Sequence, residues 1–150
     1  MSLKRIILFW LGIIGGGMLG CGYSRVETLA PVGGTIKVQG KLLTVGWIIF
    51  YPDEARGNTS PLLPVAEITK DGTYDLTTNG KPGAPLGFYK VVVAATRDVI
   101  PVRPARTADG KPIQPNWLTH EKYTKAQSTD LYVEVVETPA PGVYDLELFK

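Results

Sequence analysis

Short runs of alternating apolar and polar residues, separated by turn residues, make up most of the sequence after residue 33. Gly contributes 17 and Pro 12 of the 150 residues, and the runs between them are rich in β-branched and aromatic residues, which favour strands. No sustained 3.6-residue pattern follows Cys21, so we expect no long helix there. The pattern predicts an all-β domain, an antiparallel sandwich of about seven strands. The predicted strands are residues 35–39, 45–51, 65–69, 73–77, 88–95, 129–136 and 143–149.

The two runs on either side of Lys70-Asp71-Gly72 allow their register to be predicted. A two-residue loop would mix apolar and polar side chains on each face of the hairpin. A three-residue loop instead sets Ile68 opposite Tyr74 and gives one apolar face. Because a slip of one residue turns every side chain to the other face, we predict the longer loop. It is a type I turn with Gly72 in the left-handed conformation.

The first twenty residues have the layout of a secretory signal. Lys4 and Arg5 precede an uncharged run, Ile6 to Gly20, which has the length of a signal-peptide core. The run is shorter than the roughly 20 apolar residues of a membrane-spanning helix. Its end, Met18-Leu19-Gly20-Cys21, resembles a bacterial lipobox, in which the cysteine is lipidated and becomes the mature N-terminus. We therefore expect residues 1–20 to be removed, and the lipid on Cys21 to hold the protein at the outside of the cytoplasmic membrane or at the outer membrane.

Gly15, Gly17 and Gly20 also match G-x-G-x-x-G, the dinucleotide-binding fingerprint. That fingerprint needs a helix after the last glycine and an acidic residue about 20 positions farther on. A linker containing Pro and Gly follows instead, and Glu27 and Asp53 lie at other distances. We therefore expect no nucleotide and no other cofactor.

The charge balance argues against a nucleic-acid partner. The formal net charge is +2, from 16 basic and 14 acidic residues. Lys4 and Arg5 account for this excess, so the chain after the signal is neutral. Proteins that bind nucleic acids normally carry a clear basic excess.

The order of motifs between residues 33 and 150 resembles a known family. GGTIKVQGKLL is followed by a strand ending in FYP, then by DGTYDLTT, GAPLGFYKVVV, KYTKAQSTDLYVEV and YDLELFK. This order is similar to that of the carboxypeptidase-regulatory-like, transthyretin-like (prealbumin-like, Ig-like) β-sandwich of many small bacterial envelope lipoproteins. The resemblance implies an extracytoplasmic accessory or adhesive module and supplies no catalytic residues. Residues 21–32 would then form the lipidated N-terminus and a tether, and residues 33–150 the sandwich domain.

The residues that most often carry catalysis or bind metals do not form a recognisable pattern. His120 is the only histidine, and Glu121 to Thr124 do not complete H-E-x-x-H, so no zinc site is expected. Asp71 to Asp75 lacks the spacing of an EF-hand and is explained by the turn, which leaves only a weak calcium site open. No G-x-S-x-G marks a nucleophilic serine, and Asn58-Thr59-Ser60 is interpreted as a loop. We therefore expect a protein that is not an enzyme.

Two features are candidates for binding. The run Gly46 to Tyr51 is apolar on both faces, so if one face enters the core, Trp47, Ile49 and Tyr51 lie on the other. That second face is either covered by the long segment 97–128, for instance by Trp117, or exposed to a partner. The segment is mildly basic and contains Trp117 and Tyr123. Its charged residues are Arg97, Arg103, Arg106, Lys111, Lys122 and Lys125, against Asp98, Asp109 and Glu121.

These observations predict a lipid-anchored protein of the cell envelope whose non-catalytic β-sandwich acts as an accessory, structural or protein-binding module. The alternative is a carbohydrate-binding module at the cell surface that stacks sugars on Trp47, Tyr51, Trp117 and Tyr123. A hydrolase is the least favoured class. The expected contacts are the membrane, through Cys21, and an envelope protein or a glycan.

Overall fold

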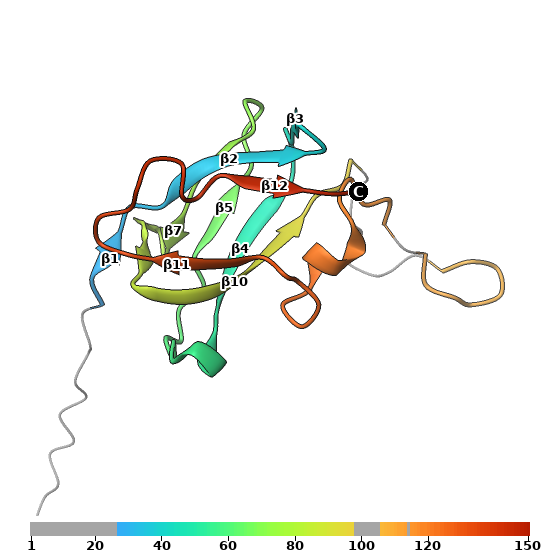
Figure 1. Ribbon diagram of the computed structural model, residues 1–150. Coiled ribbons are helices and arrows are strands. Elements are labelled where there is room, and N and C mark those ends of the chain that lie inside the picture. Colours follow the sequence, from blue (N-terminus) through green and yellow to red (C-terminus); the bar gives the residue numbers. More distant parts are fainter. Residues whose placement is uncertain (1–26, 98–105, 114) are drawn as a thin grey trace, which may run out of the picture.

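The computed structural model describes residues 27–97, 106–113 and 115–150, in which the chain forms two facing β-sheets (Figure 1). Cys21 and the predicted signal lie outside these residues. The larger sheet has six strands, all paired antiparallel. Their order is β11 (Tyr132–Val135), β10 (Gly87–Ala94), β4 (Trp47–Pro52), β5 (Val65–Glu67), β7 (Thr77–Thr78) and β8 (Lys81–Pro82).

The smaller sheet is built around β2 (Gly33–Val38). Its other strands are β12 (Leu146–Leu148), β3 (Lys41–Leu42) and β6 (Thr73–Asp75). A two-stranded sheet joins β1 (Leu29–Ala30) to β9 (Ala84–Pro85), and the two 3-10 helices of the described residues are η1 (Glu54–Arg56) and η2 (Glu121–Thr124). Each of the seven predicted runs overlaps an observed strand, so the prediction of an all-β domain is confirmed.

The hairpin at Gly72 has the predicted three-residue loop. The N–H of Thr69 donates to the carbonyl of Thr73, and Gly72 has φ +74°. Val65 pairs with Thr77 in the same register. Between the Thr69–Thr73 and Val65–Thr77 pairs the two strands of the hairpin separate. β6 pairs with β2 of the smaller sheet, while β5 pairs with β4.

The prediction of a wholly antiparallel sandwich is wrong at one pair of strands. β12 runs parallel to β2, with Leu146 opposite Ile36. The preceding strand, β11, belongs to the larger sheet, so the chain crosses between sheets before it reaches the free edge of β2. Alternation alone reveals which face of β12 is buried but not the direction in which it pairs. Asp145 fixes the pair at its start, because its Oδ1 accepts from Thr35 N (2.8 Å) and Thr35 Oγ1 (2.9 Å).

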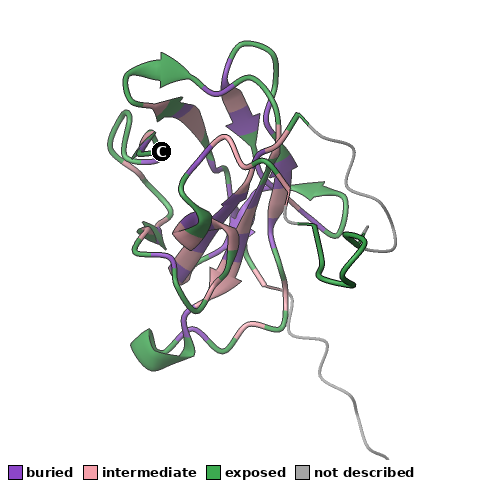
Figure 2. Ribbon diagram, turned by 90° about the vertical axis from the view of Figure 1, so that its right-hand side faces the viewer, coloured by how far each residue is buried: buried purple, intermediate pink, exposed green. Residues whose placement is uncertain are grey.

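Side chains from both sheets fill the space between them, where Figure 2 shows most of the buried residues. The ring of Phe50 in β4 lies 5.6 Å from that of Tyr89 and 6.5 Å from that of Tyr74, between centroids. The largest fully buried side chains are Tyr74, Tyr89, Tyr123, Phe50, Ile36, Ile48, Leu76 and Leu148. A core of this kind places the alternate residues of the six-stranded sheet on its outer face.

The domain begins earlier than the predicted boundary at residue 33. Leu29 and Ala30 form β1 against β9, and both Ala30 and Val32 are buried in the core. The end of the predicted tether is therefore wrong, because Ala30 and Val32 carry the inward alternation of a strand. The tether can extend no farther than residue 28.

Candidate functional site

The outer face of the six-stranded sheet carries the residues that the sequence singled out in β4. Ile48 and Phe50 enter the core, so Trp47, Ile49 and Tyr51 project from the other side, as predicted. Their cross-strand neighbours in β10 are Ala94, Val92 and Lys90. We use "outer face" below for the side chains on this side of β5, β4, β10 and β11.

Trp47 is the most exposed aromatic residue on the outer face. Its relative exposure is 53%. The small side chain of Ala94 lies beside it in β10, and Glu67 lies beside it in β5. Gly46 directs the chain into this position with φ +127°, and a Cβ there would lie 2.7 Å from the carbonyl oxygen of Ala94. The turn at Gly46 therefore brings Trp47 onto the sheet beside the small side chain of Ala94, and its side chain remains exposed.

A second apolar row crosses the middle of the outer face. Ile49 pairs with Val92 on one side and with Val65 on the other. Val92 is 3% exposed although it does not belong to the core cluster between the sheets. Sequence reasoning missed Val92, but the unbroken run of Val91, Val92 and Val93 was the available signal, since a strand with one solvated face alternates.

The part of the outer face near the start of β10 combines aromatic and basic side chains. Lys90 lies between Tyr51 and Tyr132 in the ladder. The guanidinium carbon of Arg56 is 4.3 Å from the ring centroid of Tyr132 and 5.8 Å from that of Phe88. These distances are within the range of cation–π contacts. Arg56 therefore connects this part of the sheet with the loop that follows β4.

The structure places Trp117 and Tyr123 differently. Trp117 is half-buried and forms a β-bridge with Thr96, just beyond the end of β10, so it can share the outer face. Tyr123 is 2% exposed and belongs to the core cluster. Tyr123 is thus wrong as a stacking residue, because the one-turn helix η2 directs its ring inward.

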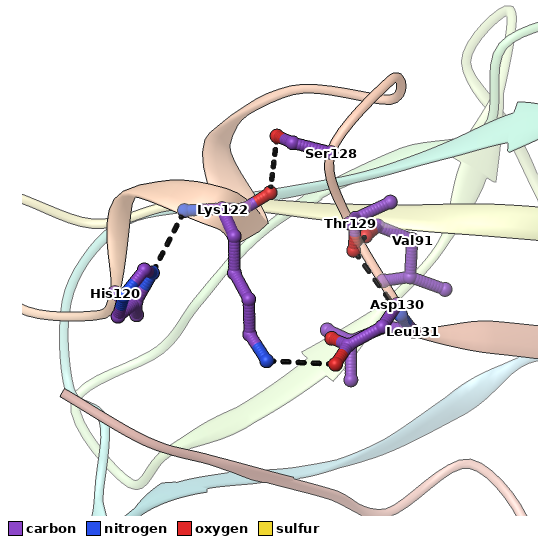
Figure 3. Close-up of polar contacts among 7 residues, drawn as sticks. All are labelled: Val91, His120, Lys122, Ser128, Thr129, Asp130 and Leu131. Atoms are coloured by element: carbon purple, nitrogen blue, oxygen red, sulfur yellow. Dashed lines mark hydrogen bonds and ion pairs between the residues drawn. The ribbon is translucent and has the colours of Figure 1, made fainter.

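Polar contacts join η2 to the segment before β11, and join that segment to β10 (Figure 3). His120 Nδ1 accepts a hydrogen bond from the backbone N–H of Lys122 (3.1 Å) and so caps the helix, which gives this loop histidine a structural role. Lys122 Nζ lies 2.7 Å from Asp130 Oδ2. That hydrogen bond raises the pKa of Lys122 and lowers the pKa of Asp130. Thr129 Oγ1 donates to the carbonyl of Val91 (2.7 Å).

The basic residues of segment 97–128 do not form one patch in the described chain. Arg106 and Lys111 lie on a fully exposed hairpin, where Arg106 donates to the carbonyl of Gly110 and Lys111 pairs with Asp109. Lys125 pairs with Glu121 (3.2 Å). Arg97 is exposed at the end of its segment, and Arg103 and Asp98 lie outside the described residues.

A cleft of about 690 Å³ lies at the other end of β10. Its walls are the loop after β4, the β9–β10 connection and the two residues before β1, Glu27 and Thr28. Asn58, of the Asn58-Thr59-Ser60 sequon, is 7% exposed, and its Nδ2 donates to the carbonyl of Phe88 (2.9 Å). The side chain of Asn58 is therefore a wall of this cleft. The cleft is lined by Glu27, Thr28, Arg56, Gly57, Asn58, Thr59, Ser60, Pro61, Leu62, Pro85, Leu86, Gly87 and Phe88.

Within the described segments, no group of three or more His, Cys, Asp or Glu side chains could hold a metal ion. The same residues include no helix that is long and apolar enough to cross a membrane. In comparisons with known proteins, no family model, no curated protein and no solved structure matches this chain.

Proposed function

We propose that this protein is a lipid-anchored, non-catalytic module of the bacterial cell envelope that binds a protein partner through the outer face around Trp47. In this proposal the domain is a transthyretin-like β-sandwich, and the lipid on Cys21 holds it at a membrane outside the cytoplasm. The lipobox-like Met18-Leu19-Gly20-Cys21 and the two-sheet, almost helix-free domain that follows support it. The module acts by position, because anchoring confines the outer face to the space next to a membrane.

The observation that carries the binding role is the exposure of Trp47 beside an apolar row. Trp47 is 53% exposed, and the next outward row of the sheet is Val65, Ile49 and Val92. Ile49 and Val65 are half-buried and Val92 is buried, so the accessible apolar surface is centred on Trp47, and exposed apolar surface marks interaction sites. Tryptophan is also among the residues that contribute most to protein interfaces.

The anchor is tested by metabolic labelling with an alkyne fatty acid. Cys21 is the only cysteine, so the native chain should incorporate the label and Cys21→Ala should not. The mass of the mature protein should correspond to cleavage before Cys21. Label that persists in Cys21→Ala, or a mature protein that begins elsewhere, would refute the anchor.

The outer face is tested by a photo-crosslinking amino acid placed at position 67 in intact cells, because Glu67 is exposed and is the cross-strand neighbour of Trp47. Leu42 in the smaller sheet is 49% exposed and is the matched control position. We expect a discrete crosslinked protein from position 67 and none from position 42. The same product from both positions, or its persistence when an outward residue of the apolar row is changed by Ile49→Asp, would contradict binding through the outer face.

Glycan binding is the second candidate, and one feature favours it. Trp47 has the carboxylate of Glu67 as its cross-strand neighbour, so an aromatic platform lies next to a hydrogen-bond acceptor for hydroxyl groups. Binding to a glycan array or to peptidoglycan fragments that is lost in both Trp47→Ala and Glu67→Gln would establish it. A negative array would leave the protein partner as the function of the outer face.

A further inference from the structure

The cleft next to the N-terminal end of the domain lies at the opposite end of β10 from Trp47 and has the size of a ligand site. Its volume, about 690 Å³, lies within the roughly 300–1,000 Å³ of small-molecule pockets. Apolar residues such as Leu62 and Leu86 line it together with two oppositely charged side chains, Glu27 and Arg56. This composition fits a small ligand that carries charges of both signs.

The walls of the cleft are held together by hydrogen bonds. Asn58 Oδ1 accepts from Ser60 N (3.1 Å) while its Nδ2 binds the carbonyl of Phe88. Ser60 Oγ donates to Glu27 Oε2 (2.8 Å). Gly87 has φ +136°, and a Cβ there would lie 3.0 Å from Asn58 Nδ2. The loop after β4 is thus fixed to β10 on one side and to Glu27 on the other, so the cleft exists before any ligand arrives.

Both charged groups keep binding capacity for a ligand. Arg56 Nε lies 3.5 Å from Asp53 Oδ2. The two terminal amino groups of Arg56 make no hydrogen bond within the described part of the chain. They can therefore bind a phosphate with two parallel hydrogen bonds. Glu27 uses Oε2 for Ser60, which leaves Oε1 as an acceptor for an ammonium group. The arrangement therefore offers one phosphate site and one ammonium site in a single cleft.

The position of Glu27 limits how far the cleft can lie from the membrane. Glu27 follows Cys21 by six residues, which span at most about 22 Å when fully extended. If Cys21 is lipidated, the cleft lies within that distance of the head groups. The most concentrated zwitterions at such a surface are the phospholipids themselves.

We propose that this cleft binds the head group of a phospholipid with a primary amine, with the phosphate on Arg56 and the ammonium on Glu27. The proposal rests on the anchor at Cys21, because the tether supplies the proximity. Binding would orient the domain with the cleft toward the membrane. The anchor would confine the domain, and the cleft would determine which end of it faces the lipid.

The first test uses the soluble head group. The full lipidated chain, in detergent free of phospholipid, is titrated with glycerophosphoethanolamine and with glycerol 3-phosphate and followed by NMR. We expect glycerophosphoethanolamine to bind about tenfold more tightly, the value of one hydrogen bond to a charged group. Glu27→Gln keeps an acceptor for Ser60 but removes the charge, so it should abolish this preference and leave glycerol 3-phosphate binding intact. Glu67→Gln, at the far end of the sheet, should keep the preference.

The second test asks whether the ligand is the lipid. The full chain is anchored in vesicles containing phosphatidylethanolamine or phosphatidylcholine, with a dye on Thr59→Cys or, as control, on Asp109→Cys of the exposed hairpin. A quencher on the lipid head groups should quench the dye at residue 59 only, more strongly in phosphatidylethanolamine, and the difference should disappear in Glu27→Gln. Equal quenching at both positions, no binding of glycerophosphoethanolamine, or binding of a neutral disaccharide in its place would overturn the proposal. The Cys21 labelling reports separately on the anchor.

Discussion

Tyr74→Phe removes one buried hydroxyl and leaves the ring in place. Tyr74 is fully buried in β6, and its Oη donates to the backbone carbonyl of Tyr144, 2.7 Å away, just before β12. Burial, and then the nearby charge of Asp145, raises the pKa of Tyr74, so the hydroxyl remains a donor throughout the usual pH range. The bond ties the strands on the two sides of β2 to each other. We expect Tyr74→Phe to weaken that connection.

The loss of stability in Tyr74→Phe follows from the contacts that remain after the substitution. Phenylalanine keeps the contact with the ring of Phe50, so little apolar burial is lost. The carbonyl of Tyr144 then loses the donor that the structure gives it in a site closed to solvent. A buried polar group left unpaired costs about 1–3 kcal/mol. For a domain of this size each kcal/mol lowers Tm by roughly 4 °C, so the expected drop is about 4–12 °C.

Thermal and denaturant unfolding of the native chain, Tyr74→Phe and Tyr51→Phe measure this effect. Tyr51 is half-exposed on the outer face, and its hydroxyl makes no hydrogen bond within the described residues, so its variant should differ from the native chain by less than about 0.5 kcal/mol. Equal stabilities of the two variants would refute the role of the Tyr74 bond. A changed denaturant slope would show that the substitution had altered the compactness of the native or denatured state, or had broken two-state unfolding.

Three further substitutions test other features. Gly46→Ala should destabilise the domain by at least about 2 kcal/mol, because φ is +127° and a backbone carbonyl lies where the Cβ would be; Gly40→Ala, with open space around it, should cost less in the same unfolding assay. Asp145→Asn should remove the pH dependence of the stability that the two Thr35–Asp145 hydrogen bonds provide. The two Thr35 hydrogen bonds lower the pKa of Asp145, so its stabilisation is complete above the unfolded value of about 3.9 and is lost as the pH falls through the folded value. The stability gap between the native chain and Asp145→Asn should therefore close below about pH 4. Trp47→Ser should abolish crosslinking or glycan retention with a change in Tm of only a few degrees, because about half of the side chain is already in solvent.

Local patterns in the sequence predicted the structure correctly where the direction of a side chain depends on residues close to it in the chain. The alternation around Gly72 predicted the loop length, because only one register puts Ile68 and Tyr74 on the same side. The apolar run in β4 likewise predicted that Trp47 and Ile49 face away from the core. In both cases the period of two residues in a strand carries the information.

Local patterns failed where distant segments decide the outcome. Tyr123 looks like the other aromatic residues of its segment, and only the docking of η2 on β10 makes it part of the core. The direction of β12 depends on a crossing between sheets that leaves no trace in its own residues. The cleft is assembled from three segments, and none of them contains a motif for it. Sequence alone could mark Asn58 only as a sequon, because its partner, the carbonyl of Phe88, is thirty residues away.

Strand β10 relates the two candidate sites in space. Gly87, at its start, lines the cleft, and Ala94, at its end, lies beside Trp47. Seven steps of about 3.3 Å separate these residues, so Trp47 is roughly 23 Å from the cleft along the strand. With the cleft against the head groups, Trp47 would stand clear of the lipid and face a partner in the aqueous space. The two proposals therefore support each other, since a tryptophan held next to the bilayer could bury itself in the interface and would be a poor site for a protein partner.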